Sequence, residues 1–141
     1  MVNVDIDSHY FRVNLYNGIS LAYIDRTPSS PPDTKVKGTI VLIHGFPQCS
    51  YQWRTVIPLL LSAGYRVIAP DYRGAGESSK PNESFTKAMM AADIIMLLDH
   101  LGLTEAVHVV GHDIGGIIAF ALALRWPERV STVRTLKRRA A

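Results

Sequence analysis

Short apolar runs alternate along this chain with longer segments in which apolar residues recur at helical spacing. Five runs rich in β-branched or aromatic residues predict strands: 10–15, 19–24, 40–43, 66–69 and 107–110. Three segments of helical periodicity predict helices: 50–62, 85–101 and 114–126. The expected order is two strands followed by three strand–helix units. Such alternation favours an α/β fold with a parallel sheet and helices on both faces.

Turn residues mark the ends of these elements. Asn17-Gly18 lies between the first two runs and predicts a two-residue hairpin turn, so the fold should begin with a β-hairpin. Ser50 is the expected N-cap of the first helix. The Pro/Ser-rich segment 27–37 predicts a surface loop within one domain, because the residues before it are too few to fold alone.

Length and charge narrow the classes of protein that fit. The chain of 141 residues is one domain at most, and its net charge of +3 comes from a basic end holding Arg134, Lys137, Arg138 and Arg139. The rest is close to neutral, so we expect no nucleic-acid partner, and no apolar stretch is long enough to span a membrane. With Cys49 as the single cysteine and no secretory signal at the N-terminus, we expect a cytoplasmic protein.

Residues 111–116, Gly-His-Asp-Ile-Gly-Gly, join a predicted strand to a predicted helix. This is the context of a nucleophile elbow, a sharp turn that exposes its apex residue, and the apex here is Asp113. Glycines two residues before and after the apex suit a turn in which side chains would collide. The alternative is that Asp113 only caps the helix. The full glycine spacing after a buried strand favours the elbow.

An aspartate at the apex narrows the chemistry. A carboxylate that attacks a saturated carbon forms an alkyl ester, which water can hydrolyse at the enzyme's own carbonyl carbon. A serine in the same attack would form an ether, which cannot be cleaved in this way. Asp113 therefore indicates displacement at saturated carbon, as in opening an epoxide or expelling a halide, and a serine-type esterase is disfavoured.

A second loop is expected beside the elbow. His44-Gly45-Phe46-Pro47 follows the 40–43 strand directly, and the carboxyl ends of neighbouring parallel strands converge at one edge of a sheet. The backbone N–H groups of Phe46 and Ile114 could then form an oxyanion hole for the tetrahedral intermediate.

Four motifs together resemble the epoxide hydrolase branch of the α/β-hydrolase family. They are the 44–47 loop, Asp71-Tyr-Arg-Gly-Ala-Gly-Glu-Ser78, the 111–116 elbow and Arg125-Trp-Pro-Glu-Arg-Val130, and the match covers roughly residues 10–130. The resemblance implies Asp113 as nucleophile, Phe46 and Ile114 as oxyanion-hole donors, a cis peptide at Pro47, a small-molecule epoxide substrate and strand order 1-2-4-3-5-6-7-8.

The resemblance also separates related chemistries. Haloalkane dehalogenases typically carry asparagine at the Phe46 position and tryptophan at the Ile114 position, and fluoroacetate dehalogenases place arginine after the nucleophile. This chain fits neither pattern. Epoxide opening is therefore the favoured prediction, and a dehalogenase acting on an alkyl halide or haloacetate is the alternative.

Other polar residues are expected to be structural. Asp71 and Arg73 suggest a turn-stabilising pair, and His112 suggests a hydrogen-bonded packing residue that points away from the site. His9, His100 and His108 lack metal-ligand spacing, and the tryptophans imply no cofactor box. We therefore predict no metal and no cofactor.

The family's acid and histidine follow the nucleophile in the chain. After Asp113 the sequence holds one acid, Glu128, and no histidine. Residues 1–130 are therefore predicted to be the N-terminal part of an α/β-hydrolase domain, truncated after the elbow helix and without the cap tyrosines that the resemblance implies. Residues 131–141 are expected to be an aberrant basic tail from a premature end, with a nuclear-localisation or nucleic-acid patch as the alternative.

Truncation carries two consequences for behaviour. The 106–110 strand would be an open sheet edge, through which the protein could self-associate or act as a non-catalytic binding or regulatory partner. With no base to activate water, an epoxide would alkylate Asp113 once without turnover.

Overall fold

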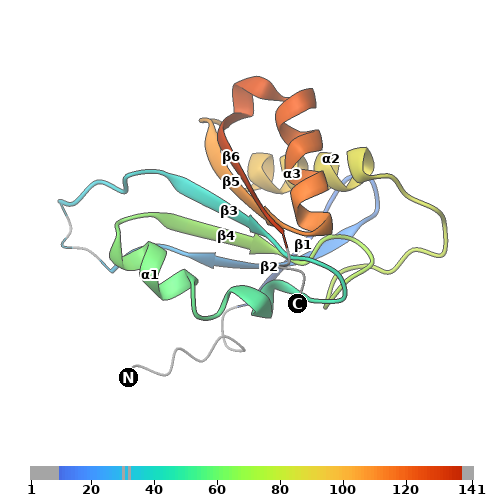
Figure 1. Ribbon diagram of the computed structural model, residues 1–141, viewed down its shortest axis with the longest axis horizontal. Helices are drawn as coiled ribbons and strands as arrows, with labels where there is room; N and C mark the ends of the chain where they lie inside the picture. Colours follow the sequence, from blue (N-terminus) through green and yellow to red (C-terminus); the bar gives the residue numbers. More distant parts are fainter. Residues whose placement is uncertain (1–9, 30, 32, 138–141) are drawn as a thin grey trace.

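The computed structural model describes residues 10–29, 31 and 33–137 (Figure 1). Its centre is a six-stranded sheet of order β1-β2-β4-β3-β5-β6. The strands are β1 (Tyr10–Asn14), β2 (Ser20–Arg26), β3 (Thr39–Ile43), β4 (Arg66–Pro70), β5 (Val107–His112) and β6 (Val130–Leu136). The hairpin and the β2–β4 pair are antiparallel, and the ladders joining β4, β3, β5 and β6 are parallel. This arrangement confirms the predicted α/β class and the order of the strands described.

Helices cover both faces of the sheet. Helices α2 (Lys87–His100) and α3 (Ile114–Arg125) lie on one face, and α1 (Ile57–Ser62) lies on the other with the short 3₁₀ helix η2 (Ser50–Trp53) (Figure 1). Alternate residues of β3 supply the two cores, because successive side chains of a strand point to opposite faces. Val41 and Ile43 join the core beneath α2 and α3, whereas Ile40 and Leu42 join the one beneath α1.

The N-terminal hairpin is present, but its turn is longer than predicted. Leu15 N–H donates to the Ile19 carbonyl at 2.8 Å, which leaves three residues between them. Gly18 N–H donates to the Leu15 carbonyl at 3.0 Å, and Gly18 has a φ of 84°. This is a turn followed by a left-handed glycine, the common three-residue hairpin loop, so the glycine signal predicted the hairpin correctly and its turn length wrongly.

The single helix predicted over 50–62 is broken into η2 and α1. Pro58 lies in the first turn of α1. A continuous helix would need an N–H from Pro58, which proline lacks. Ser50 was predicted to be an N-cap, but it does not cap a helix. Its backbone N–H and its hydroxyl both donate to Asp71 Oδ1, at 2.8 and 2.6 Å. The helix predicted over 85–101 is α2, and there Thr86 accepts from Met89 N–H as N-cap.

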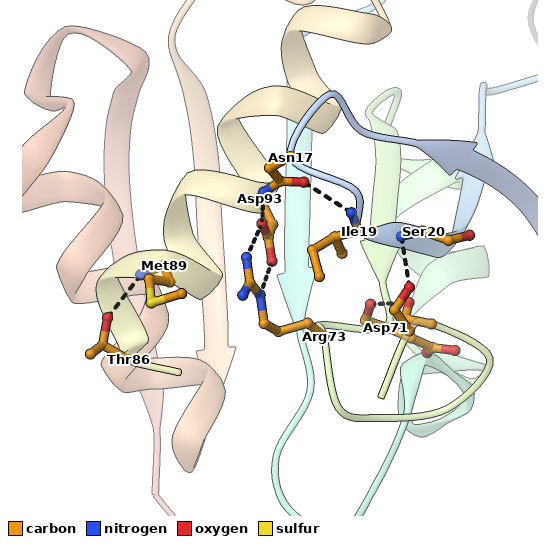
Figure 2. Close-up of polar contacts among 10 residues, drawn as sticks. Asn17, Ile19, Ser20, Asp71, Arg73, Thr86, Met89 and Asp93 are labelled. Carbon is orange, nitrogen blue, oxygen red and sulfur yellow. Dashed lines mark hydrogen bonds and ion pairs between the residues drawn. The ribbon is translucent and has the colours of Figure 1, made fainter. Parts of the chain in front are cut away.

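Asp71 and Arg73 do not form the predicted pair. The Arg73 guanidinium instead donates twice to the Asp93 carboxylate, at 2.6 and 2.7 Å, and Asn17 Nδ2 donates to the same carboxylate at 2.9 Å (Figure 2). Asp71 accepts from Glu77 N–H at 3.0 Å within its own loop. Asp71 therefore holds both its own loop and the start of η2, whereas Arg73 forms a buried ion pair that ties the loop to α2.

Residues 131–136 belong to the sheet, so the prediction that the fold ends at residue 130 is wrong. They continue β6, which pairs along β5 from Val130 to Leu136. The prediction that 106–110 forms the open edge is wrong for the same reason, since β5 has β3 on one side and β6 on the other. Three of the six residues 131–136 are valine or threonine, and their β-branched side chains suit a strand despite Arg134. Residues 138–141 of the expected tail lie outside the described residues.

Within residues 10–29, 31 and 33–137, no helix combines the length and apolar character needed to cross a lipid bilayer.

Candidate active site

The sharp turn predicted from residues 111–116, called the elbow below, is present. Strand β5 ends at His112 and helix α3 begins at Ile114, so Asp113 alone makes the turn. Asp113 has a φ of 55° and a ψ of −120°, and it is the one non-glycine residue with positive φ in the described part of the chain. A non-glycine residue in such a conformation costs about 1–3 kcal/mol. The surrounding packing maintains this strain, and the side chain of Asp113 is exposed.

The glycines of the motif allow three backbone segments to touch. A Cβ on Gly111 would lie 2.2 Å from the carbonyl oxygen of Gly115, and a Cβ on Gly115 would lie 2.2 Å from that of Ile43. No side chain fits at either position. The start of α3 therefore rests directly on the ends of β5 and β3, as the spacing of the glycines indicated.

The Asp113 carboxylate does not cap its helix. No hydrogen bond runs from the backbone of α3 to this side chain. Its Oδ2 instead accepts from the backbone N–H of Phe46 at 3.2 Å, across 67 residues of sequence. No hydrogen bond from the described residues reaches Oδ1. The simple capping alternative is therefore wrong, and one carboxylate oxygen is held while the other is free.

Sheet register brings the two loops together. Ile43, the last residue of β3, pairs with Gly111 of β5, so the residues that follow each strand lie side by side. Contact is close, because a Cβ on Gly45 would meet Asp113 Cβ at 3.0 Å. The Phe46–Pro47 peptide is cis, as the resemblance implied.

The direction of the Phe46 N–H is set by the peptide that contains it. The carbonyl of that peptide belongs to Gly45, and it accepts from His44 Nδ1 at 2.9 Å and from Gln48 N–H at 2.9 Å. In a trans peptide the C=O and the N–H point in opposite directions. Holding the Gly45 oxygen on one side therefore directs the Phe46 N–H to the other, toward Asp113.

His44 supports this peptide as a neutral ring. It is fully buried and stacks on Tyr72 with ring centroids 3.9 Å apart. Burial lowers the pKa of His44, which outweighs the opposing effects of the Gly45 hydrogen bond and of Asp71. Because Gly45 O only accepts, Nδ1 must carry the proton. Nε2 is then unprotonated, and it finds no hydrogen-bond partner within the described residues.

The pKa of the Tyr72 hydroxyl depends on its burial and on the negative charge of Asp113. Burial, and then the nearby negative charge of Asp113, raise the pKa of Tyr72 to about 12. Its hydroxyl therefore stays protonated at neutral pH. Sequence reasoning did not single out Tyr72, whose place against His44 and near Asp113 depends on how the 71–78 loop folds.

Ile114, the second predicted donor, is the first residue of α3. Its N–H belongs to the first turn, where amides have no acceptor within the helix. The structure does not bring this N–H into a hydrogen bond with the Asp113 side chain. Beside Asp113, the exposed side chains of Ile117, Phe120 and Leu136 line an apolar hollow.

Sequence reasoning also missed Gln52. It falls within the helix predicted over 50–62, and no sequence signal distinguished it from the other residues of that segment. In the structure its amide lies 2.9 Å from His112 Nδ1 and also accepts from Gly45 N–H. His112 is thus hydrogen-bonded, as predicted. The described residues hold no group of three or more histidines, cysteines or carboxylates placed to bind a metal ion.

Known proteins are similar to this chain in sequence and in fold. A family model described as alpha/beta hydrolase fold matches residues 38–137. Epoxide hydrolase A of Mycobacterium tuberculosis is 38% identical over 122 residues, which cover 85% of this chain and 36% of that protein. Bifunctional epoxide hydrolase 2 of Sus scrofa is 43% identical over 99 residues, covering 69% of this chain and 18% of the pig protein.

A solved structure of another epoxide hydrolase is similar to this chain over most of its length. The crystal structure of epoxide hydrolase A from Mycobacterium thermoresistibile superimposes with a TM-score of 0.77 at 37% identity, covering 89% of this chain and 38% of that one. The chain thus spans well under half the length of the relatives it matches.

Proposed function

From the premise that this chain belongs to the α/β-hydrolase family, and within it resembles the epoxide hydrolases, we propose that Asp113 is the nucleophile of an epoxide-opening reaction. One observation carries the proposal. The Phe46 N–H holds Asp113 Oδ2, while Oδ1 is free on an exposed and strained elbow. A carboxylate held in this way is oriented for attack before substrate arrives, which lowers the entropic part of the barrier.

In the first step, Asp113 Oδ1 attacks an epoxide carbon and forms a C–O bond. The bond between that carbon and the ring oxygen breaks, and its electron pair passes to the ring oxygen, which takes up a proton from water and leaves a hydroxide ion. The product is a hydroxyalkyl ester of Asp113. Oδ2 becomes the carbonyl oxygen of this ester and already lies 3.2 Å from the Phe46 nitrogen.

In the second step, water adds to the Asp113 carbonyl carbon. Negative charge then develops on Oδ2, where the Phe46 N–H already donates. The Ile114 N–H, free of helix hydrogen bonds, is the proposed second donor. Collapse of the intermediate cleaves the ester, releases a diol, restores the carboxylate and releases one proton, which neutralises the hydroxide left by the first step. This step needs a base, for which we propose no residue among those described.

The surface beside Asp113 favours apolar epoxides. Ile117 and Phe120 are 54% and 62% exposed, and with Leu136 they present an apolar surface to a molecule approaching Oδ1. Phe46, itself 70% exposed, borders the approach from the other loop. A cytoplasmic location stays a prediction from the sequence.

Intact-mass spectrometry of the purified chain with styrene oxide tests the proposal. We expect a mass increase of one epoxide per chain, located by peptide mapping at Asp113, and no increase in Asp113→Asn. Asp33→Asn is the matched control, because Asp33 is an exposed carboxylate in the 27–37 loop and should not affect labelling.

Two outcomes would contradict parts of this proposal. Labelling that persists in Asp113→Asn, or that is absent from the unaltered chain, would refute the role of Asp113. Accumulation of many equivalents of diol would instead refute the prediction of a single alkylation without turnover.

A further inference from the structure

Gln52 connects the two loops of the site through one side-chain amide. It lies on η2, outside both loops. Its Oε1 accepts from Gly45 N–H at 3.0 Å, and its Nε2 lies 2.9 Å from Nδ1 of His112. Gly45 immediately precedes Phe46, and His112 immediately precedes Asp113. One side chain therefore holds the residues before the proposed oxyanion donor and before the proposed nucleophile.

The chemistry of these contacts assigns the protons. A backbone N–H only donates, so the Gln52 atom facing Gly45 must be the carbonyl oxygen. The other end of the amide is then NH₂, which only donates. His112 Nδ1 must accept from it and carries no proton. Neutral His112 is therefore protonated on Nε2, the opposite tautomer to His44.

The three residues are packed as well as hydrogen-bonded. A Cβ on Gly45 would lie 2.6 Å from His112 Nδ1, so the loop backbone rests against the imidazole. Rotation of His112 would break its contact with Gln52, and a shift of the Gly45 backbone would break the other Gln52 contact. The 3.2 Å distance from Phe46 N to Asp113 Oδ2 depends on both loops staying in register.

We propose that Gln52 is a positioning residue that locks the 44–47 loop to the elbow by holding Gly45 N–H and the Nε2-protonated His112 together. Its effect on reaction rests on the proposed role of Asp113. The assignment of the His112 proton does not, so the two can fail separately.

Nitrogen chemical shifts of the histidine rings test the assignment in the full chain, with the His112 signals identified by their loss in His112→Asn. In the unaltered protein we expect Nδ1 of His112 without a proton and Nε2 with one. Gln52→Glu keeps the acceptor for Gly45 but removes the donor, and a carboxylate only accepts, so Nδ1 should gain a proton.

Gln48→Glu is the matched control. It makes the same change of charge four residues away at an exposed side chain, and only its backbone contacts the site. It should leave the His112 pattern unchanged. The proposal is overturned if unaltered His112 carries its proton on Nδ1, a result that needs no variant to fold. It is also overturned if Gln52→Glu has no effect or if both variants act alike.

Labelling by styrene oxide tests the effect on reaction. If Gln52 orients the carboxylate, Gln52→Leu should lower the limiting rate of adduct formation about ten- to a hundredfold, while the half-saturating epoxide concentration stays within about twofold. An unchanged limiting rate in a variant whose circular dichroism matches the unaltered chain would overturn the positioning role. If no form of the protein is labelled, the role of Asp113 fails, and the ring shifts alone decide whether the Gln52 lock exists.

Discussion

Helix α3 meets strand β3 at a contact between Gly115 and Ile43, where a Cβ on the glycine would lie 2.2 Å from the carbonyl oxygen of the isoleucine. Backbone atoms on both sides of this contact are held by the sheet and the helix, so they cannot move aside independently. The close approach keeps Asp113 beside the loop that carries the Phe46 N–H.

Gly115→Ala should therefore destabilise the fold by about 1–3 kcal/mol or more, since overpacking against backbone forces the helix off the sheet. Urea denaturation measures the change. Gly38→Ala is the control, because the nearest atoms to its Cβ, in the His108 ring, are 3.7 Å away, and we expect a change within about 1 kcal/mol. Equal unfolding midpoints for the two variants would show that the contact does not constrain the fold.

Breaking the buried pair between Arg73 and Asp93 should lower the free energy of unfolding by more than Gly115→Ala does. These side chains are 8% and 1% exposed, so Asp93→Asn leaves a buried guanidinium without its counter-charge. We expect destabilisation of about 3–5 kcal/mol by urea denaturation. Glu77→Gln removes the exposed pair with Arg12, at 3.9 Å, and should cost no more than about 1 kcal/mol. A small effect of Asp93→Asn would mean that water reaches the pair.

His44 predicts how stability depends on pH. Its pKa is lowered in the folded protein from the ordinary value of 6.5, so below that pH the unfolded chain binds a proton that the folded chain does not. The contribution of His44 is complete above pH 6.5 and is lost as the pH falls toward its folded pKa. The unaltered protein should thus lose more free energy of unfolding on acidification than His44→Asn, whose amide can still donate to Gly45. Parallel losses in both proteins, measured by denaturation across this range, would contradict the prediction.

Tyr72 predicts a change in alkaline titration. The Asp113 charge contributes to raising the Tyr72 pKa to about 12, so Asp113→Asn should lower that pKa while burial keeps it above 10.0. Tyrosinate absorbance measures the shift, with the Tyr72 transition identified by its loss in Tyr72→Phe and followed only where circular dichroism stays unchanged. Asp33→Asn should leave the titration as it was. If the Tyr72 titration occurs at the same pH in Asp113→Asn as in the unaltered protein, the Asp113 carboxylate does not lie close enough to affect Tyr72, and the prediction is wrong.

Local patterns predicted much of the site. The glycines around Asp113 and the runs of β-branched residues before each loop identified the elbow, the parallel strands and the approach of Phe46. These features depend on neighbouring residues and on the common edge of a parallel sheet, so they can be read from spacing alone. The strand 130–136 was missed because Val130 and Val133, the residues that pack on the core, are three positions apart, so the segment lacks the alternation of every second residue that predicts a strand.

Sequence by itself thus determined where the backbone turns sharply and which residue is exposed there. It also suggested the chemistry that we propose for that residue. Only the tertiary structure decided which polar side chains pair with one another. Arg73 pairs with Asp93, 20 residues away, and Gln52 reaches His112, 60 residues away. Side chains at such separations meet only after strands, loops and helices have packed, because each buried charge or amide must find a hydrogen-bond partner in whatever space the packing leaves. These pairings therefore cannot be read from the spacing of residues in the sequence.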